Sequence, residues 1–166
     1  MKLKNLILFP ALALILSGCG YTVKSSLPEN IQTVAVLVKN ESSEPSIEVE
    51  VTKALQAEIQ MDGRLRLVTS GNADAILNVT LYKYNLIPVA FDRRRGERAR
   101  EYRVELHGRA VLSDANTGEV IFEAPTVRGE ADFIYAADVT TSKMMALPKV
   151  AAEFARKTVS HTVTAW

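Results

Sequence analysis

The stretch Tyr102-Arg-Val-Glu-Leu-His-Gly-Arg-Ala-Val-Leu112 alternates between apolar and polar residues. Successive side chains of a β-strand point to opposite faces of a sheet, so this period of two predicts a strand with one buried and one wet face. We expect Tyr102, Val104, Leu106, Ala110 and Leu112 to face in, and Arg103, Glu105, His107 and Arg109 to face out. The sheet that contains this strand should therefore be covered on one face.

Strands are also expected on both sides of this stretch. Asp114 to Glu119 has the composition of a hairpin turn, and a returning strand is expected from Val120 to Val127. Upstream, residues 75–86 form a long predicted strand that Pro88 should weaken at its end. We expect residues 129–137 to be irregular. Together these segments predict a meander of long strands.

A helix is predicted before the meander and another after it. Apolar residues recur every four positions over residues 46–62, with Ser46 as the expected N-cap and Gly63 as the C-terminal stop. Short strands are expected at 33–38 and 65–68. The C-terminal helical region is predicted in two pieces, 140–146 and a second piece with an apolar stripe over residues 151–159, and Pro148 is expected to be a helix start, a break or a kink. The order predicts an α+β two-layer sandwich, with a mostly antiparallel sheet of four to five strands and both helices on one face.

The N-terminus has the pattern of a lipoprotein signal. Lys2 and Lys4 precede an apolar run that is shorter than the roughly 20 residues of a membrane-spanning helix. The run ends in Leu16-Ser-Gly-Cys19, which resembles the bacterial lipobox, in which the cysteine is acylated after the chain is cut before it. Because stable anchoring takes at least two acyl chains, an acylated Cys19 could hold the domain on a membrane. The alternative is a buried free cysteine.

These segments divide the chain into three parts. We expect a signal peptide at 1–18, a lipidated tether at 19–32 and a single domain at 33–166. Removing the first 18 of 166 residues leaves 148, which is enough for one hydrophobic core. With 20 basic and 19 acidic residues the chain is nearly neutral, which gives no indication of nucleic-acid binding. Cys19 is the single cysteine, so the fold has no intrachain disulfide.

The sequence contains no recognisable catalytic or metal-binding motif. His107 and His161 have no partner at metal-ligand spacing, and no nucleophile elbow or phosphate-binding loop is present. We therefore expect neither an enzyme nor a protein with a cofactor or metal.

One loop is unusually basic. It runs from Asp92 to Arg100 between two long strands, and its arginines are Arg93, Arg94, Arg95, Arg98 and Arg100. The guanidinium group binds phosphate and carboxylate through two hydrogen bonds at once. The loop is therefore a candidate site for a phosphorylated glycolipid or another anion, and the alternative is a solvated turn that keeps the hairpin soluble.

The mature sequence resembles the LptE family of lipopolysaccharide-assembly lipoproteins. The resemblance begins at Cys19-Gly-Tyr21 and continues through residues 27–36, 72–77, 101–104 and 112–118 to the C-terminal helix. It implies a sheet with two helices, a place inside the lumen of an LptD-like β-barrel as its plug and assembly partner, and lipopolysaccharide binding by basic residues near a strand-connecting loop. The matching place here is the arginine loop. Gly20 after the cysteine is compatible with an outer-membrane location on the periplasmic side.

A second function remains open. An envelope lipoprotein could instead regulate a periplasmic enzyme or a secretion complex through contacts of its exposed sheet face.

Overall fold

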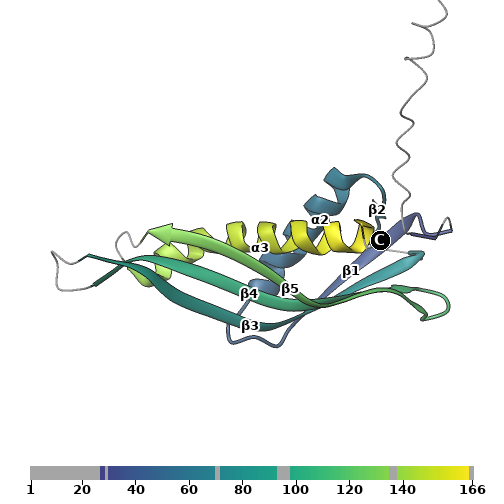
Figure 1. Cartoon of the computed structure of the whole chain (residues 1–166). Coiled ribbons are helices and arrows are strands. Elements are labelled where there is room, and N and C mark those ends of the chain that lie inside the picture. The colour runs from purple at the N-terminus through teal and green to yellow at the C-terminus, as the bar shows by residue number, and fades with distance from the viewer. Residues whose placement is uncertain (1–26, 29, 70–71, 93–97, 135–137, 165–166) are drawn as a thin grey trace, which may run out of the picture.

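A computed structural model describes residues 27–28, 30–69, 72–92, 98–134 and 138–164. The elements in chain order are β1 (Thr33–Asn40), α2 (Ile47–Asp62), β2 (Arg66–Leu67), β3 (Ala75–Asp92), β4 (Arg98–Asp114), β5 (Val120–Ile134) and α3 (Val139–Thr164). They form one five-stranded sheet in the order β2-β1-β3-β4-β5, and both helices lie along one of its faces (Figure 1). The predicted α+β two-layer sandwich is confirmed.

The sheet is mixed. The three long strands β3, β4 and β5 are antiparallel, whereas β1 runs parallel to β2 and β3. The start of the parallel β1–β3 pair is fastened by Asp74, whose Oδ2 accepts hydrogen bonds from the backbone N–H of Gln32 and Thr33 and, at 2.7 Å, from the Thr33 hydroxyl. These bonds, led by that of the Thr33 hydroxyl, lower the pKa of Asp74.

The predicted first helix is confirmed, and its apolar stripe faces the sheet. Ile47, Val51, Leu55 and Ile59 are buried in α2, as their spacing predicts. Gly63 ends the helix at φ 74°, and its N–H donates to the Ile59 carbonyl at 3.1 Å. Ser46 occupies the N-cap position, but its side chain makes no capping hydrogen bond and its φ is 64°.

The meander strands are longer than the sequence predicted. The expectation of irregular structure from residue 129 is wrong for residues 129–134, which continue β5, whereas residues 135–137 lie outside the described part of the chain. Strand β3 continues through Pro88 to Asp92. Pairing with β1 stops at Leu81, so the outer half of β3 is an edge strand, where proline is tolerated. A register shift follows Pro88.

The C-terminal region is a single helix, so two separate pieces, with a helix start or break at Pro148, are contradicted. Pro148 lies inside α3, is exposed, and removes one backbone hydrogen bond. The helix continues because Ala146 and Val150, on either side of the proline, are buried against the core.

Helix α3 packs closely on two glycines of the sheet. A Cβ atom on Gly108 would lie 2.8 Å from Cζ of Phe154, and one on Gly129 would lie 2.7 Å from the carbonyl oxygen of Val150. Phe154 is fully buried. Gly108 pairs with Val127 and Gly129 with Leu106, so the two glycines lie close together on β4 and β5, Gly108 against the Phe154 ring and Gly129 against the backbone of α3.

Candidate functional site

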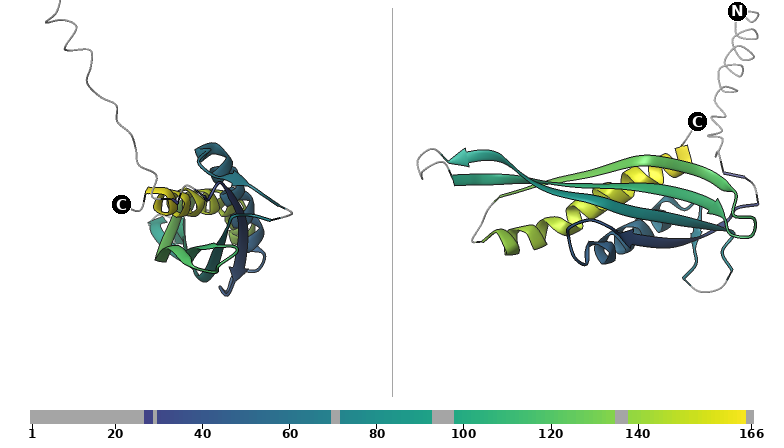
Figure 2. Two further views of the ribbon diagram at one scale, coloured as in Figure 1. Left: turned by 90° about the vertical axis from the view of Figure 1, so that its right-hand side faces the viewer. Right: turned by 90° about the horizontal axis from the view of Figure 1, so that it is seen from below.

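The described strands of the β3–β4 hairpin reach Asp92 and Arg98, and this end of the hairpin projects beyond the start of α3 (Figures 1 and 2). The backbone of Arg98 and Arg100 belongs to β4, whereas Arg93, Arg94 and Arg95 lie outside the described residues. The loop therefore connects Asp92 to Arg98, whose strands pair directly. The sheet narrows toward this end, because β1 pairing stops at Leu81 and β5 pairing stops at Glu101.

The sheet face that the helices leave open carries a network of ion pairs along β4 and β5. Arg103 Nε lies 2.7 Å from Asp132 Oδ1, and Arg103 Nη1 lies 3.7 Å from Glu130. Arg128 pairs with both Glu105 and Glu130. The hydrogen bond from Arg103 lowers the pKa of Asp132 and, in turn, raises the pKa of Arg103. The network therefore presents mostly compensated charge.

Glu105 is more enclosed than an outward strand position predicts. Its side chain points to the open face, yet the residue is buried beneath Arg128 and His107. Burial by itself raises the pKa of Glu105, but the hydrogen bond from His107 and the charge and hydrogen bond of Arg128 together leave the pKa of Glu105 below its ordinary value. His107 Nε2 lies 3.4 Å from Glu105 Oε2, and the alternation of the strand predicted that these two residues share a face.

Three further polar groups meet where the outer half of β3 passes α3. Lys143 Nζ lies 2.6 Å from Glu44 Oε2 and 5.7 Å from the centre of the Tyr84 ring. The Tyr84 hydroxyl is buried and has no hydrogen-bond partner within the described residues. Burial, followed by the charge of Glu44, raises the pKa of Tyr84 to about 12. Lys143 thus joins the β1–α2 loop to the first turns of α3.

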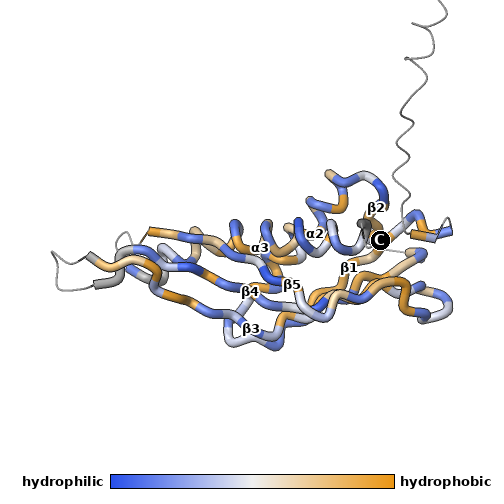
Figure 3. Tube along the Cα trace, in the orientation of Figure 1, coloured by the Kyte–Doolittle hydropathy of each residue, from blue (hydrophilic) through white to orange (hydrophobic). Residues whose placement is uncertain are grey.

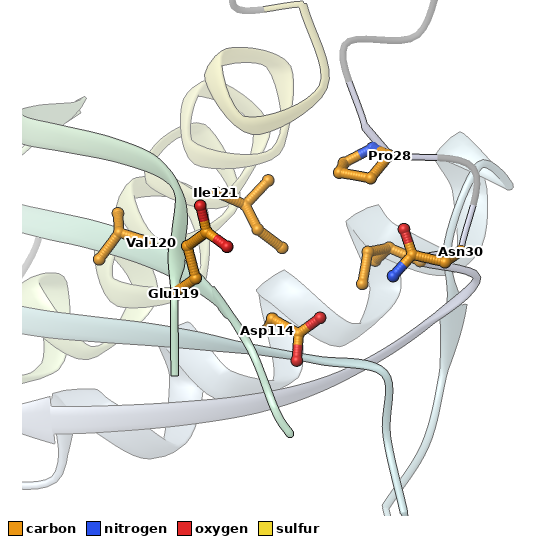
Figure 4. A pocket seen from close by; sticks show the side chains of 7 residues that line it. Pro28, Asn30, Asp114, Glu119, Val120 and Ile121 are labelled. Atoms are coloured by element: carbon orange, nitrogen blue, oxygen red, sulfur yellow. The ribbon is translucent and has the colours of Figure 1, made fainter. Parts of the chain in front are cut away.

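A hollow of about 370 Å³ lies at the opposite end of the sheet from the paired residues Asp92 and Arg98. Figure 4 shows Pro28 and Asn30, which precede β1, across the opening from Glu119 and Ile121 of the β4–β5 turn and strand. The nearby Asp114 carboxylate is already occupied, because its Oδ1 accepts hydrogen bonds from two backbone N–H groups of the turn. Asp114 therefore serves as a structural acceptor that holds the β4–β5 turn.

The structure describes only some of the other residues that the sequence analysis considered as ligands or attachment sites. No group of three or more His, Cys, Asp or Glu residues capable of holding a metal occurs among the described residues. His161 lies exposed in the last turns of α3. Cys19 precedes the described part of the chain. Within that part, neither helix has the length and apolarity needed to cross a membrane.

The family assignment follows from the sequence match. A family model described as "LptE: Lipopolysaccharide-assembly" matches residues 31–160. The chain belongs to the LptE family. This range runs from the residues before β1 to the last turns of α3, so it covers the whole sandwich. The LptE family is a non-enzymatic family of lipopolysaccharide-assembly lipoproteins, which is consistent with the expectation that this chain is not an enzyme.

Solved structures with the same fold are distant in sequence. A point variant of PelC from Paraburkholderia phytofirmans, described as a dodecamer, is 13% identical at a TM-score of 0.53 over 82% of this chain and 92% of its own. Protein XCC0632 from Xanthomonas campestris is 11% identical at a TM-score of 0.54 over 82% and 88%. Uncharacterized lipoprotein B from Nitrosomonas europaea is 15% identical at a TM-score of 0.50 over 87% and 92%. No curated protein matches the sequence.

Two kinds of functional candidate were missed at the sequence level. The first is the set of ion pairs between β4 and β5, such as that of Arg103 with Asp132. Which residues pair across these strands depends on their register, and the register cannot be read from the sequence. Exposed apolar side chains near the hairpin end, including Ile87 and Phe91, were hidden because an apolar residue in a strand is normally assigned to the core. Phe91 lies two residues before the first arginine of the loop, and this nearness to a charged loop could have indicated that its side chain is exposed.

Proposed function

We propose that this LptE-family chain is an outer-membrane lipoprotein that plugs an LptD-like β-barrel and binds lipopolysaccharide during its delivery to the cell surface. Residues 1–18 form the signal, residues 19–32 the tether lipidated at Cys19, and residues 33–166 the domain. The acyl chains hold the domain on the periplasmic side of the membrane. The match to a lipopolysaccharide-assembly family over residues 31–160 is the observation that carries this proposal.

The ligand contact is the arginine loop. In the chain, Arg93, Arg94 and Arg95 directly follow Asp92, which pairs with Arg98 at the end of the β3–β4 hairpin, and the backbone of Arg98 and Arg100 belongs to β4. Further along the open face, Arg103 is already paired with Asp132 and Arg128 with Glu105 and Glu130. Arginines in the loop bind the phosphates of lipid A, because bidentate, charge-assisted hydrogen bonds suit that group.

The barrel contact is the open face of the sheet. A barrel lumen is polar and wet, so a plug should present polar groups whose charges are mostly compensated. The face formed by β4 and β5 has this character, with Arg103, Glu105, Arg128, Glu130 and Asp132 held in one network.

Ligand binding is tested by replacing the five loop arginines with alanine. The variant should bind purified lipopolysaccharide more weakly, and the salt sensitivity of binding should fall, because exposed charges are screened. Arg156→Ala is the matched control, since Arg156 is an exposed arginine of α3 paired with Glu153. Unchanged binding by the five-fold variant would contradict the loop assignment.

Anchoring and partnership need separate experiments. Cys19→Ser should move the protein from the membrane fraction to the soluble fraction of the periplasm, because the acyl chains are lost. Affinity purification of the lipidated chain should recover a large β-barrel protein. Recovery of a periplasmic enzyme or secretion component in its place would favour the regulatory alternative.

A further inference from the structure

We infer that Leu37 is the anchor of the barrel contact, covered in the complex by an apolar side chain of the β-barrel partner. Leu37 belongs to a small apolar surface on the open face of the sheet. This surface consists of Leu37, Ile76 and Val111 and is called the inner patch below. The inference rests on the proposed function and deepens it, because it assigns the barrel contact to particular side chains.

Strand register places the three residues side by side. Leu37 pairs with Asn78, and Asn78 pairs with Val111. Ile76 lies two positions before Asn78 on β3, so it is the diagonal neighbour of both Leu37 and Val111. The register shifts of β3 begin only after Leu81, so regular alternation holds across the whole inner patch.

The burial of neighbouring residues shows which face the inner patch occupies. The residues before and after each member along its strand belong to the core or pack against it on the helix side, and they are Val36, Val38, Ala75, Leu77, Ala110 and Leu112. Successive side chains of a strand point to opposite faces, so Leu37, Ile76 and Val111 face away from the helices. Figure 2 shows both helices on the other side of the sheet.

Contacts within the chain leave the inner patch partly open. The Leu37 side chain is 57% exposed, and Ile76 and Val111 are half-buried beside it. Figure 3 shows apolar stretches in this part of the sheet, and the register identifies the residues of those stretches that face outward. Exposed apolar residues that occur singly need no explanation, whereas contiguous ones mark interaction surfaces.

The polar groups around the inner patch indicate that its occupant is a protein. The next row of the open face carries Lys39 and Arg109, and Lys39 Nζ lies 2.7 Å from Glu41 Oε1. On the side of β5, Val111 pairs with Glu123. An apolar centre inside a polar rim of both signs is the usual composition of a protein–protein contact. Anionic lipid headgroups would be repelled by the carboxylates of this rim.

The barrel is the partner because the inner patch continues the proposed barrel contact. Val111, Arg109, His107 and Glu105 occupy alternate positions of β4, and the even-numbered residues from 104 to 112 are all buried. The inner patch and the ion-pair network therefore share one uninterrupted strand face. In a polar lumen, a desolvated apolar contact is the energetic centre of the interface, and the surrounding polar pairs supply complementarity.

Photocrosslinking in cells tests the contact in the full, lipidated chain. The crosslinker is introduced as Leu37→benzoylphenylalanine, with Val49→benzoylphenylalanine as the control. Val49 is a matched control because it is an apolar residue with 47% exposure, but it lies on α2 in the helical layer. Adducts are separated by size and identified by mass spectrometry.

The expected result is an adduct between position 37 and a large β-barrel protein, clearly more abundant than any such adduct at position 49. If the barrel protein copurifies with the chain but position 37 gives no more adduct than position 49, the inference is overturned and the proposed function stands. An adduct of position 37 with lipid alone or with a second copy of the chain would overturn it as well. Failure to recover any barrel protein, by crosslinking or by copurification, would overturn both.

The pair Leu37→Asp and Val49→Asp provides a second measurement. Both side chains are exposed, so both variants should unfold near the wild-type temperature. Only Leu37→Asp should lose most of the copurified barrel protein, because it places a charge in an apolar contact. Full retention of the barrel protein by a folded Leu37→Asp variant would contradict the role of Leu37 as anchor.

Discussion

Substitution of Gly129 by alanine should loosen the docking of α3 on the sheet. The new Cβ would lie 2.7 Å from the carbonyl oxygen of Val150, 2.8 Å from Cβ of Phe154 and 2.9 Å from its backbone nitrogen. Two of these three atoms belong to the helix backbone, so no side-chain rotation can relieve the contact. The helix as a whole has to move away from β5.

The magnitude follows from two opposing effects. Overpacking a well-packed core costs about 1–3 kcal/mol. Replacing a glycine inside a strand returns about 0.5–1 kcal/mol, because the unfolded chain loses freedom. The net loss in the free energy of unfolding should be about 1–2 kcal/mol. For a domain of this size, the corresponding fall in Tm is about 3–6 °C.

Thermal unfolding followed by circular dichroism measures this effect on the purified mature chain. Thr126→Ala is the control, because Thr126 is exposed on the same strand and its replacement should change stability by less than about 0.5 kcal/mol. A double-mutant cycle separates the two glycines. Phe154→Leu should partly rescue Gly108→Ala, whose new Cβ meets the ring, but not Gly129→Ala, whose new Cβ meets the helix backbone.

A Gly129→Ala protein that unfolds at the wild-type temperature would refute the reasoning, because it would mean that α3 does not approach β5 this closely. Equal rescue of both glycine variants by Phe154→Leu would likewise contradict the assignment of the Gly129 contact to the helix backbone.

Three further substitutions test other parts of the fold. Phe154→Ala should destabilise the protein by about 3–5 kcal/mol in urea unfolding, because it empties a fully buried site. Asp74→Asn should lower Tm at pH 7 and flatten its acid dependence: the pKa of Asp74 is depressed by the Thr33 hydroxyl, so its contribution is present above the ordinary value of 3.8 and lost as pH falls through the folded pKa. Lys143→Met should destabilise by about 1–2 kcal/mol, because it leaves the mostly buried Glu44 without its ion pair, and should speed hydrogen exchange in the first turns of α3.

The fold was largely predictable because local pattern and tertiary packing agree over most of the chain. Alternation in β4 and the four-residue spacing in α2 each identified the buried face. Prediction failed where packing overrides local signals. Pro148 ended the predicted first piece of helix, yet burial of Ala146 and Val150 keeps α3 continuous. The direction of β1 could not be predicted, since parallel pairing depends on where α2 crosses the sheet.

The sequence predicted the positive charge of the candidate site, but it did not predict which side chains lie around the site. The arginines can be read directly from the sequence, and the hairpin that presents them follows from two alternating segments. By contrast, the pairing of Arg128 with Glu105 joins residues 23 positions apart and depends on the β4–β5 register. The exposure of Ile134 depends on β5 continuing through a segment that the sequence predicted to be irregular.

The fold and the proposed ligand contact therefore have different origins in this molecule. Chains only 11–15% identical share the sandwich, so many sequences satisfy its pattern of buried positions, and the fold by itself carries no information on the ligand. Side chains on the open face of the hairpin end do not have to follow this pattern of buried positions, because the helices lie on the other face. The sheet is also narrower there, since pairing with β1 stops at Leu81 and pairing with β5 at Glu101. A sequence is free to place arginine at this end without disturbing the core, so substitutions at residues 87–100 should alter the proposed ligand contact while leaving the stability of the domain unchanged.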